Sequence, residues 1–418
     1  MDRLGPFGAA PRLGVGVSGG ADSSALVLLA ETWARARGGS ILALVVDHGL
    51  RPESALQSTA TVARLNDRGI AARRLVLQPP PSGPDISDAA RAARFAALGA
   101  ACSEAAIAFL LLAHTRADQA ETVLWRGLRA SGTIGVAGMA ARRETGWGAV
   151  LRPLLDVAPA RLRATCRAAG LEWIEDPTNR DPRFARPRLR ALLADPAGTG
   201  PAIAALAGVA ARHGQARAAA EAALAEELAS HAELRPEGFA LVQCPAGLTA
   251  LAARQLVRTV GGLAYPPGAA AALALLRRGQ GTLAGVEVSP AGRLGPGIVL
   301  AREPALVGPP AAIGTAALVW DRRWRVRGPA GAVVGALGGA AVPGRERLPA
   351  RLAAVLPAIR AADGRLLAVP GLGLHAGQAD GTFAACFAPP APLAGARFLP
   401  TRWQDDPLCA GTLQGSAG

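Results

Sequence analysis

The first chemically informative residues form a loop rich in glycine and serine near the start of the chain. Its sequence is SGGADSS, and it lies between an apolar stretch over 13–17 and a helix-like stretch over 25–37. Two adjacent glycines let the backbone turn closely around an anion, while the free amides and the dipole of the following helix attract negative charge. The pattern predicts a pyrophosphate site made of Ser18, Gly19, Gly20, Ala21, Asp22 and Ser23.

An acidic side chain, Asp22, stands inside this anion-binding loop. Its charge makes little sense beside a phosphate unless a metal ion or another cation offsets it. We therefore expect Asp22 to lie near a bound Mg²⁺. The common P-loop is a poor match, because it needs a lysine and the chain has none. Glycine and serine also serve turns and helix caps that bind nothing, so the loop by itself leaves a structural interpretation open.

Polar residues also follow two other apolar runs of strand length. Asp47 and His48 end one such run, and His114 follows another. His114 and Asp118 have helical spacing, so they share a face if the next helix begins at His114. Other polar residues that follow these two runs include Arg51, Gln119 and Glu121.

These clusters can meet only if the strands before them end at one edge of a sheet. Apolar runs of strand length occur at 13–17, 41–46, 74–77 and 107–113. Helix-like stretches alternate with them at 25–37, 55–67 and 87–101. Such alternation predicts an α/β fold, a parallel sheet with helices on both faces and ligands at the carboxyl ends of its strands.

The SGGxDS pattern resembles the signature of the PP-loop ATP pyrophosphatases, enzymes with a fold similar to that of the adenine nucleotide alpha hydrolases. Within that superfamily, five motifs in order resemble the tRNA(Ile)-lysidine synthases over roughly the first 190 residues. They are the Ser18 loop, Asp47 to Arg51 with Ser54, the segment AHTRADQAETVLWRGLRASGTIGVAG from Ala113, the run RPLL from Arg152, and WIEDPTN from Trp173.

The resemblance implies a two-step reaction on a tRNA anticodon. ATP adenylates the O2 atom of the wobble cytidine in the CAU anticodon of tRNA(Ile), and the ε-amine of free L-lysine then attacks C2, which leaves lysidine and changes decoding from AUG to AUA. AMP and pyrophosphate are released, and Mg²⁺ neutralises the departing pyrophosphate. The expected cofactor is Mg²⁺, with ATP as a substrate.

The resemblance also implies roles for individual residues. Asp47 and His48 would lie by the nucleotide, and His114 and Asp118 would be needed for activity. The sequence from Ala90 to Phe95 is similar to an ARxxRY helix of the family, which would bring Arg91 and Arg94 to the reaction. Contacts with the substrates would come from Arg51, Gln119, Glu121, Arg186 and Arg190.

Several positions depart from the family pattern. Phe95 replaces a tyrosine, and Ala117 stands where a second acid is common. Ala130 replaces a frequent glycine. Pro187 replaces an asparagine within the basic run RFARPRLR, and it removes an amide donor there. Because Asp118 is retained, we expect activity to persist.

The length of 418 residues predicts more than one domain. We expect a catalytic domain over 1–195, a mainly helical tRNA-binding domain over 196–308 and a small α+β domain over 309–418 that contacts the tRNA acceptor. The net charge of +14, carried on the basic side by arginine alone, favours a nucleic-acid partner.

Cysteine usage and the amino terminus bear on the compartment. The five cysteines lack a CxxC pair, and no signal-peptide core or membrane span is evident. We expect a cytoplasmic enzyme without a membrane partner; its oligomeric state stays open. Two alternatives remain, a related tRNA thiolase and a tRNA-binding module with a degenerate ATP site. Thiolases mostly depend on cysteine pairs, whereas Ala117 and Pro187 keep the second alternative open.

Overall fold

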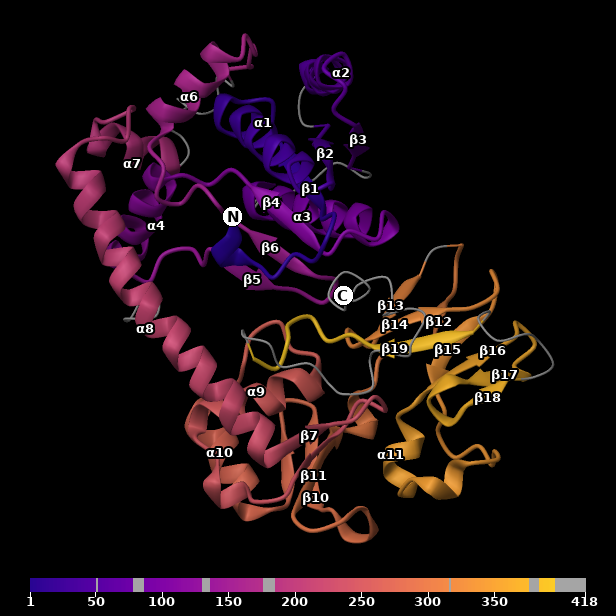
Figure 1. Cartoon of the computed structure of the whole chain (residues 1–418). Helices are drawn as coiled ribbons and strands as arrows, with labels where there is room; N and C mark the ends of the chain where they lie inside the picture. Colours follow the sequence, from indigo (N-terminus) through magenta and orange to yellow (C-terminus); the bar gives the residue numbers. More distant parts are fainter. Residues whose placement is uncertain are drawn as a thin grey trace. The chain divides into compact units, whose positions relative to one another are not determined.

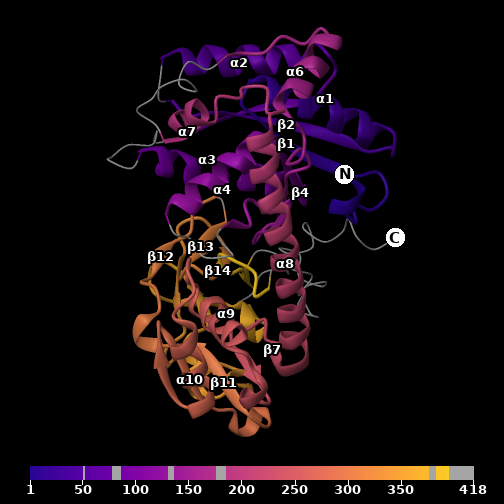
Figure 2. The same ribbon diagram turned by 90° about the vertical axis from the view of Figure 1, so that its left-hand side faces the viewer.

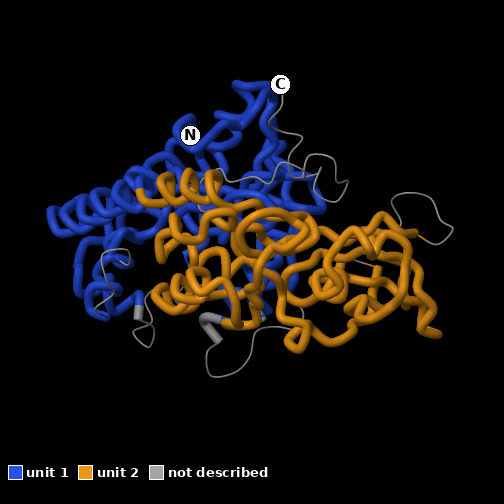
Figure 3. Tube along the Cα trace, turned by 90° about the horizontal axis from the view of Figure 1, so that it is seen from below, with its two compact units in different colours: residues 1–219, 411–418 blue, residues 220–410 orange. Residues whose placement is uncertain are grey.

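The computed structural model describes residues 1–49, 52–77, 86–129, 136–175, 185–315, 317–375 and 383–394. The chain divides into two compact units (Figure 3). Unit 1 covers residues 1–219 and unit 2 begins at Ala220. Among the residues that the structure describes, none of the helices combines the length and the apolar content needed to cross a membrane.

Unit 1 is built on a six-stranded sheet with the order β3-β2-β1-β4-β6-β5 (Figure 1). Five strands are parallel, and only β5 runs antiparallel to its neighbour. The strands are β1 (Arg12–Val17), β2 (Ser40–Asp47), β3 (Ala72–Val76), β4 (Phe109–Leu112), β5 (Arg142–Glu144) and β6 (Ala149–Leu151). The predicted parallel α/β fold is therefore confirmed.

Helices cover both faces of this sheet (Figure 2). Leu13, Val15 and Val17 point to one face, where they pack with α1 (Ala21–Arg35) and α6 (Pro159–Ala168). Leu110 and Leu112 point to the other face, where they pack with the third helix. The helices of unit 1 are α1 (Ala21–Arg35), α2 (Pro52–Asn66), α3 (Ile86–Glu104), α4 (Arg116–Leu128), α6 (Pro159–Ala168) and α7 (Ala185–Leu193).

The first helix begins earlier than the apolar pattern predicts. It starts at Ala21 with Gly20 as its N-cap, so Asp22 and Ser23 belong to its first turn. The Ser23 hydroxyl donates to the Gly20 carbonyl at 2.9 Å. Polar residues in a first turn bring no apolar periodicity, which is why the pattern misses them.

One long helix, α8 (Pro201–His231), runs across the boundary between the units. Unit 2 continues with helices α9 (Ala250–Gly261), α10 (Ala269–Arg278) and α11 (Ala350–Ala354). Its first sheet has the order β7-β8-β11-β10-β9, over β7 (Ala232–Leu234), β8 (Ala240–Val242), β9 (Gly281–Leu283), β10 (Val286–Pro290) and β11 (Ile298–Arg302).

Two smaller sheets complete unit 2. One has the order β12-β15-β16-β17-β18, over β12 (Ala311–Ala312), β15 (Val333–Ala336), β16 (Pro357–Arg360), β17 (Leu366–Val369) and β18 (Leu374–His375). The other has the order β13-β14-β19, over β13 (Leu318–Trp320), β14 (Trp324–Arg327) and β19 (Ala384–Phe387). One buried core joins Leu256 and Leu300 with Trp320 and Ile359, so residues on both sides of position 308 share it. The three-domain division stays a prediction.

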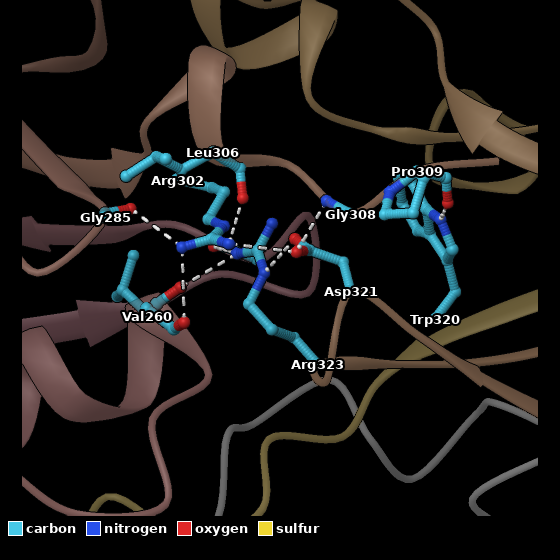
Figure 4. A network of polar contacts seen from close by, with 11 residues as sticks. Val260, Gly285, Arg302, Leu306, Gly308, Pro309, Trp320, Asp321 and Arg323 are labelled. Atoms are coloured by element: carbon cyan, nitrogen blue, oxygen red, sulfur yellow. Dashed lines mark hydrogen bonds and ion pairs between the residues drawn. The ribbon is translucent and has the colours of Figure 1, made fainter.

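A buried ion network lies within this shared core (Figure 4). Asp321 accepts from Arg302 at 3.1 Å and from Arg323 at 2.9 Å. Arg323 also donates to the carbonyls of Gly238 and Val260. Arg302 donates to the carbonyls of Gly261, Gly285 and Leu306. The network ties the end of α9 to the β13–β14 hairpin.

Candidate functional site

Strand order places the predicted site. Strand β1 pairs with β2 on one side and with β4 on the other. The chain crosses the sheet in opposite directions from β1, which makes the gap between β1 and β4 a topological switch point. Gly16 is level with Leu112, so the loop after Val17 and the residues after Leu112 meet at one edge. The Ser18 loop and His114 are brought together as predicted.

The Ser18 loop holds itself in shape with its own serines. The backbone amide of Ser18 donates to the Ser23 hydroxyl at 3.2 Å, and the two hydroxyls lie 3.2 Å apart. Gly19 has a φ of +83°, and a Cβ there would come within 3.2 Å of Thr61 Oγ1. The positive φ therefore favours glycine at this position, and the space for a Cβ there is tight. The preformed loop and the N-terminus of α1 can receive an anion.

Asp22 lies beside this loop, in the first turn of α1, and the pKa of its carboxyl group is raised. Burial, and next the charge of Asp118, raise the pKa of Asp22 to about 6. Its Oδ1 atom is buried and accepts no hydrogen bond from the residues that the structure describes. Such an oxygen fits a cation, and carboxylate oxygens are the ligands that Mg²⁺ prefers. Within the described ranges no three His, Cys, Asp or Glu side chains could hold a metal by themselves, so Mg²⁺ would need oxygens of its nucleotide as well.

Asp118 caps the helix it stands on. Thr115 is the N-cap of α4, and Asp118 Oδ2 accepts from its amide at 2.8 Å and from its hydroxyl at 2.9 Å. The helix begins at Arg116, so His114 lies outside it and does not share a helical face with Asp118. A capping box at this position is a sequence signal that the apolar pattern overlooks. The Oδ1 atom of Asp118 is left for other contacts.

His114 is neutral at physiological pH. Burial lowers the pKa of His114 to about 3, although the charge of Asp118 opposes the shift. The Nδ1 atom is buried and has no hydrogen-bond partner. The cations that push the pKa in the same direction as burial are Arg152, Arg91 and Arg186. The imidazole is available for hydrogen bonds as an uncharged group.

Arg190 joins α7 to two acids of α4. Its Nε donates to Glu121 Oε1 at 2.6 Å, and its Nη2 lies 3.6 Å from Asp118 Oδ1. The Glu121 side chain is only 3% exposed, and burial raises its pKa, although the hydrogen bond from Arg190 opposes the shift. Two carboxylates therefore share one nearby cation at the carboxyl end of β4.

Two predicted residues have their polar atoms committed within the protein. The Gln119 amide donates to the Met139 carbonyl at 3.0 Å and accepts from the Met139 amide at 2.7 Å. Asp47 accepts from the Ser54 hydroxyl, from the Gly49 amide at 3.0 Å and from Arg74 at 2.5 Å. These contacts fix the loops that follow β2 and α4. Both residues are then suited to position the site.

Arginines gather on the other side of His114. Arg91 and Arg94 of α3 lie 5.7 Å and 5.8 Å from the ring centre of Phe95. Arg143 of β5 lies 5.5 Å from the same ring. Arg152 follows β6 and is 5% exposed. Sequence reasoning placed Arg152 only within a motif and passed over Arg143, because nothing local shows that a hairpin brings them to α3.

Some predicted residues cannot be placed so fully. Arg51 lies outside the described residues, as do Ala130 and the stretch from Asp176 to Asn179. His48 follows β2 and is partly exposed. Arg186 lies in α7, and its positive charge contributes to lowering the pKa values of Arg94 and His114.

The chain is similar to proteins of known function. A model of the PP-loop domain family matches residues 4–196. The tRNA(Ile)-lysidine synthase of Bradyrhizobium sp. strain BTAi1 is 41% identical over 296 residues, which is 67% of this chain and 83% of that protein. The tRNA(Ile)-lysidine synthase of Methylobacterium nodulans is 40% identical over 284 residues, 64% of this chain and 80% of that protein.

A solved structure is more distant. The U34-tRNA thiolase NcsA from Methanococcus maripaludis, with its 4Fe-4S cluster, aligns with a TM-score of 0.43 and 15% identity, over 51% of this chain and 75% of that one. A likeness of this size supports no functional argument. The sequence relatives identify the family, because the chain covers most of their length at about 40% identity. The chain belongs to the tRNA(Ile)-lysidine synthase family.

Proposed function

We propose that the protein is an ATP-dependent ligase that converts the wobble cytidine of tRNA(Ile) with a CAU anticodon into lysidine. ATP adenylates O2 of the base and pyrophosphate leaves. The ε-amine of free L-lysine then forms a bond to C2, and AMP leaves with the former O2. The observation that carries the proposal is the switch point itself, where an anion-binding loop and a pair of carboxylates stand on either side of the β1–β4 gap.

The ATP half of the reaction belongs to the Ser18 loop. Its amides and the N-terminus of α1 would hold the pyrophosphate of ATP. Asp22, with its unpartnered Oδ1, would hold Mg²⁺ together with phosphate oxygens. The metal supplies charge neutralisation for the leaving pyrophosphate. Asp47 and His48 would support the nucleotide from the neighbouring strand, Asp47 by holding the loop after β2.

The lysine half belongs to α4. Asp118 and Glu121 present two carboxylates to one arginine, so a second cation would balance their charge. The ε-ammonium of lysine carries such a charge. It must lose a proton before it attacks C2, and Glu121, whose pKa burial raises, is suited to accept it.

The base would lie between the two halves, next to His114. A neutral imidazole with an unpartnered Nδ1 can hydrogen-bond to cytosine without adding a charge. Arg91, Arg94, Arg186 and Arg190 would contact the substrates, with Gln119 holding the loop at Met139. The substrates are solutes of the cytoplasm, and we propose that the enzyme works there.

The reaction type is tested by its products. The protein is incubated with ATP, Mg²⁺, labelled lysine and a CAU-anticodon tRNA. We expect label in the tRNA, with one AMP and one pyrophosphate released per lysine incorporated. Release of ADP and phosphate in place of AMP and pyrophosphate would contradict the proposal.

A further inference from the structure

Three guanidinium groups surround one aromatic ring at the edge of unit 1. Arg91, Arg94 and Arg143 lie between 5.5 Å and 5.8 Å from the centre of the Phe95 ring. A ring face attracts cations without cancelling their charge. Phe95 therefore holds these groups together while they remain positive.

Arg152 adds a fourth cation that is more deeply buried. It is 5% exposed, and it donates to the Ala140 carbonyl at 2.8 Å. Its Nε atom is buried and has no hydrogen-bond partner among the described residues. Burial, and next the nearby Arg143 and Arg91, lower the pKa of Arg152 to about 10. Burial and Arg91 likewise lower the pKa of Arg94.

No acid pairs with Arg94, Arg143 or Arg152 in the part of the chain that the structure describes. Burying an unpaired cation such as Arg152 is unfavourable by several kcal/mol, on the order of 3 or more, so such a group is retained where an anion completes its surroundings. Arg143, by contrast, is exposed.

The cluster and the Ser18 loop lie on opposite sides of His114. Arg152 follows β6 and Arg143 lies in β5, whereas the loop follows β1, and β4 with His114 stands between them. Since neighbouring strands are about 4.8 Å apart, β6 lies roughly 10 Å from β1. The loop already supplies amides for the pyrophosphate of ATP. A second anion site on the far side of the reacting base suits the strand that carries the base.

We propose that Arg94 and Arg143, which lie beside Phe95, together with the nearby Arg152, bind the phosphodiester groups of the RNA strand that flank the reacting cytidine. The site rests on the proposed function for the identity of the RNA. Guanidinium groups from α3, β5 and the end of β6 each offer a fork of donors that matches a phosphate, and successive phosphates are what a single RNA strand offers. The mutual repulsion of these guanidinium groups is offset only when the negatively charged strand is bound.

The test is the binding of unmodified CAU-anticodon tRNA over a range of salt concentrations, with ATP binding measured separately without tRNA. The variants are Arg143→Met, Arg152→Met and Phe95→Leu. The matched control is Arg35→Met, which removes an exposed arginine paired with Glu31 on α1. If Arg152→Met does not fold, Arg143→Met, at an exposed position, carries the test.

We expect each arginine variant to raise the tRNA Kd about tenfold and to reduce the slope of log K against log salt by about 0.7 to 0.9. Phe95→Leu should weaken binding less, with the slope almost unchanged. ATP binding should match the control. A tRNA Kd within twofold of the control would overturn the proposal, and so would weakened ATP binding with tRNA binding intact. Because binding is measured without turnover, wild-type protein that binds tRNA but forms no lysidine would count against the proposed function alone.

Discussion

Buried arginines in the two units have different partners. In unit 2, Arg302 and Arg323 are 4% and 0% exposed, and they share Asp321 and several backbone carbonyls. In unit 1, Arg152 is as deeply buried, at 5% exposed, but its hydrogen bond goes to one carbonyl. Burial therefore does not distinguish Arg152 from Arg302 and Arg323. What separates them is whether an acid of the protein already completes the cluster.

The carbonyls in unit 2 add to this difference. Arg323 donates to Val260 and Arg302 to Gly261, at the end of α9. The C-terminus of a helix carries partial negative charge, so it favours the guanidinium groups there. The Arg302–Asp321–Arg323 network is thus complete without a ligand. We interpret it as structural, and the cluster around Phe95 as a site that binds.

The largest effect expected from this comparison is on stability in unit 2. Asp321→Ala leaves two buried guanidinium groups unpaired, and it should lower the free energy of unfolding by about 3 to 5 kcal/mol. Urea unfolding measures it. Asp363→Ala is the control, because Asp363 and its partner Arg365 are both about two-thirds exposed and 4.0 Å apart. Equal losses in the two variants would mean that the network does not stabilise unit 2.

Glu121 tests the intermediate case, in which a buried acid has an arginine partner and a proposed ligand as well. Glu121→Gln keeps the size of the side chain and removes its charge. We expect the KM for lysine to rise by a factor of about ten or more, which corresponds to a charge-assisted hydrogen bond of about 1.5 to 3 kcal/mol. ATP binding should be unchanged. An unchanged KM for lysine would leave Glu121 as a structural partner of Arg190.

Arg152 and Arg323 contrast the two groups directly. Arg152→Met removes a cation from a repelling cluster, so stability should stay within about 1 kcal/mol of wild type or rise slightly. Arg323→Met takes away a partner of Asp321, and its cost should be larger, about 3 kcal/mol or more. Thermal or urea unfolding compares them. A large loss for Arg152→Met would show that its burial serves the fold.

The smallest effect concerns Asp47 and acid. Burial by itself would raise its pKa, but the hydrogen bonds from Ser54, Arg74 and Gly49 lower the pKa of Asp47 to about 2. A lowered carboxyl pKa stabilises the fold above the ordinary value near 4, and this stability is lost as pH falls toward 2. The contribution should be about 1 to 2 kcal/mol, reduced by solvent around Arg74.

Asp47→Asn should remove this part of the acid sensitivity. Unfolding is measured between pH 5 and pH 2 for the variant and for Asp363→Asn. The wild type and the control should lose stability more steeply than Asp47→Asn. Parallel curves for all three proteins would contradict the assigned hydrogen bonds.

Four of the six strands of unit 1 and the turn into α1 were predictable because their signals are local. Apolar runs mark β1 to β4, and SGGADSS marks the turn into α1. The start of α1 at Ala21 was not predicted, because polar first-turn residues carry no periodicity. The sequence also could not show that the Gln119 side chain would bind the backbone of Met139, since this contact depends on how the chain returns to α4 twenty residues later.

The arginine sites show the same limit more strongly. Arg94, Arg143 and Arg152 lie far apart in the chain, and only the β5–β6 hairpin brings the last two to α3. In sequence they are indistinguishable from Arg302 and Arg323. Partners that are missing or present can be counted only once the fold is known.

The central claim is that the base beside His114 is a cytosine to which lysine becomes joined. The direct measurement is mass spectrometry of nucleosides from CAU-anticodon tRNA and from the same tRNA with uridine at the wobble position, each after incubation with ATP, Mg²⁺ and lysine. We predict a lysine adduct on the cytidine and none on the uridine tRNA. Adducts on both tRNAs, or on neither while AMP is still released, would contradict the account.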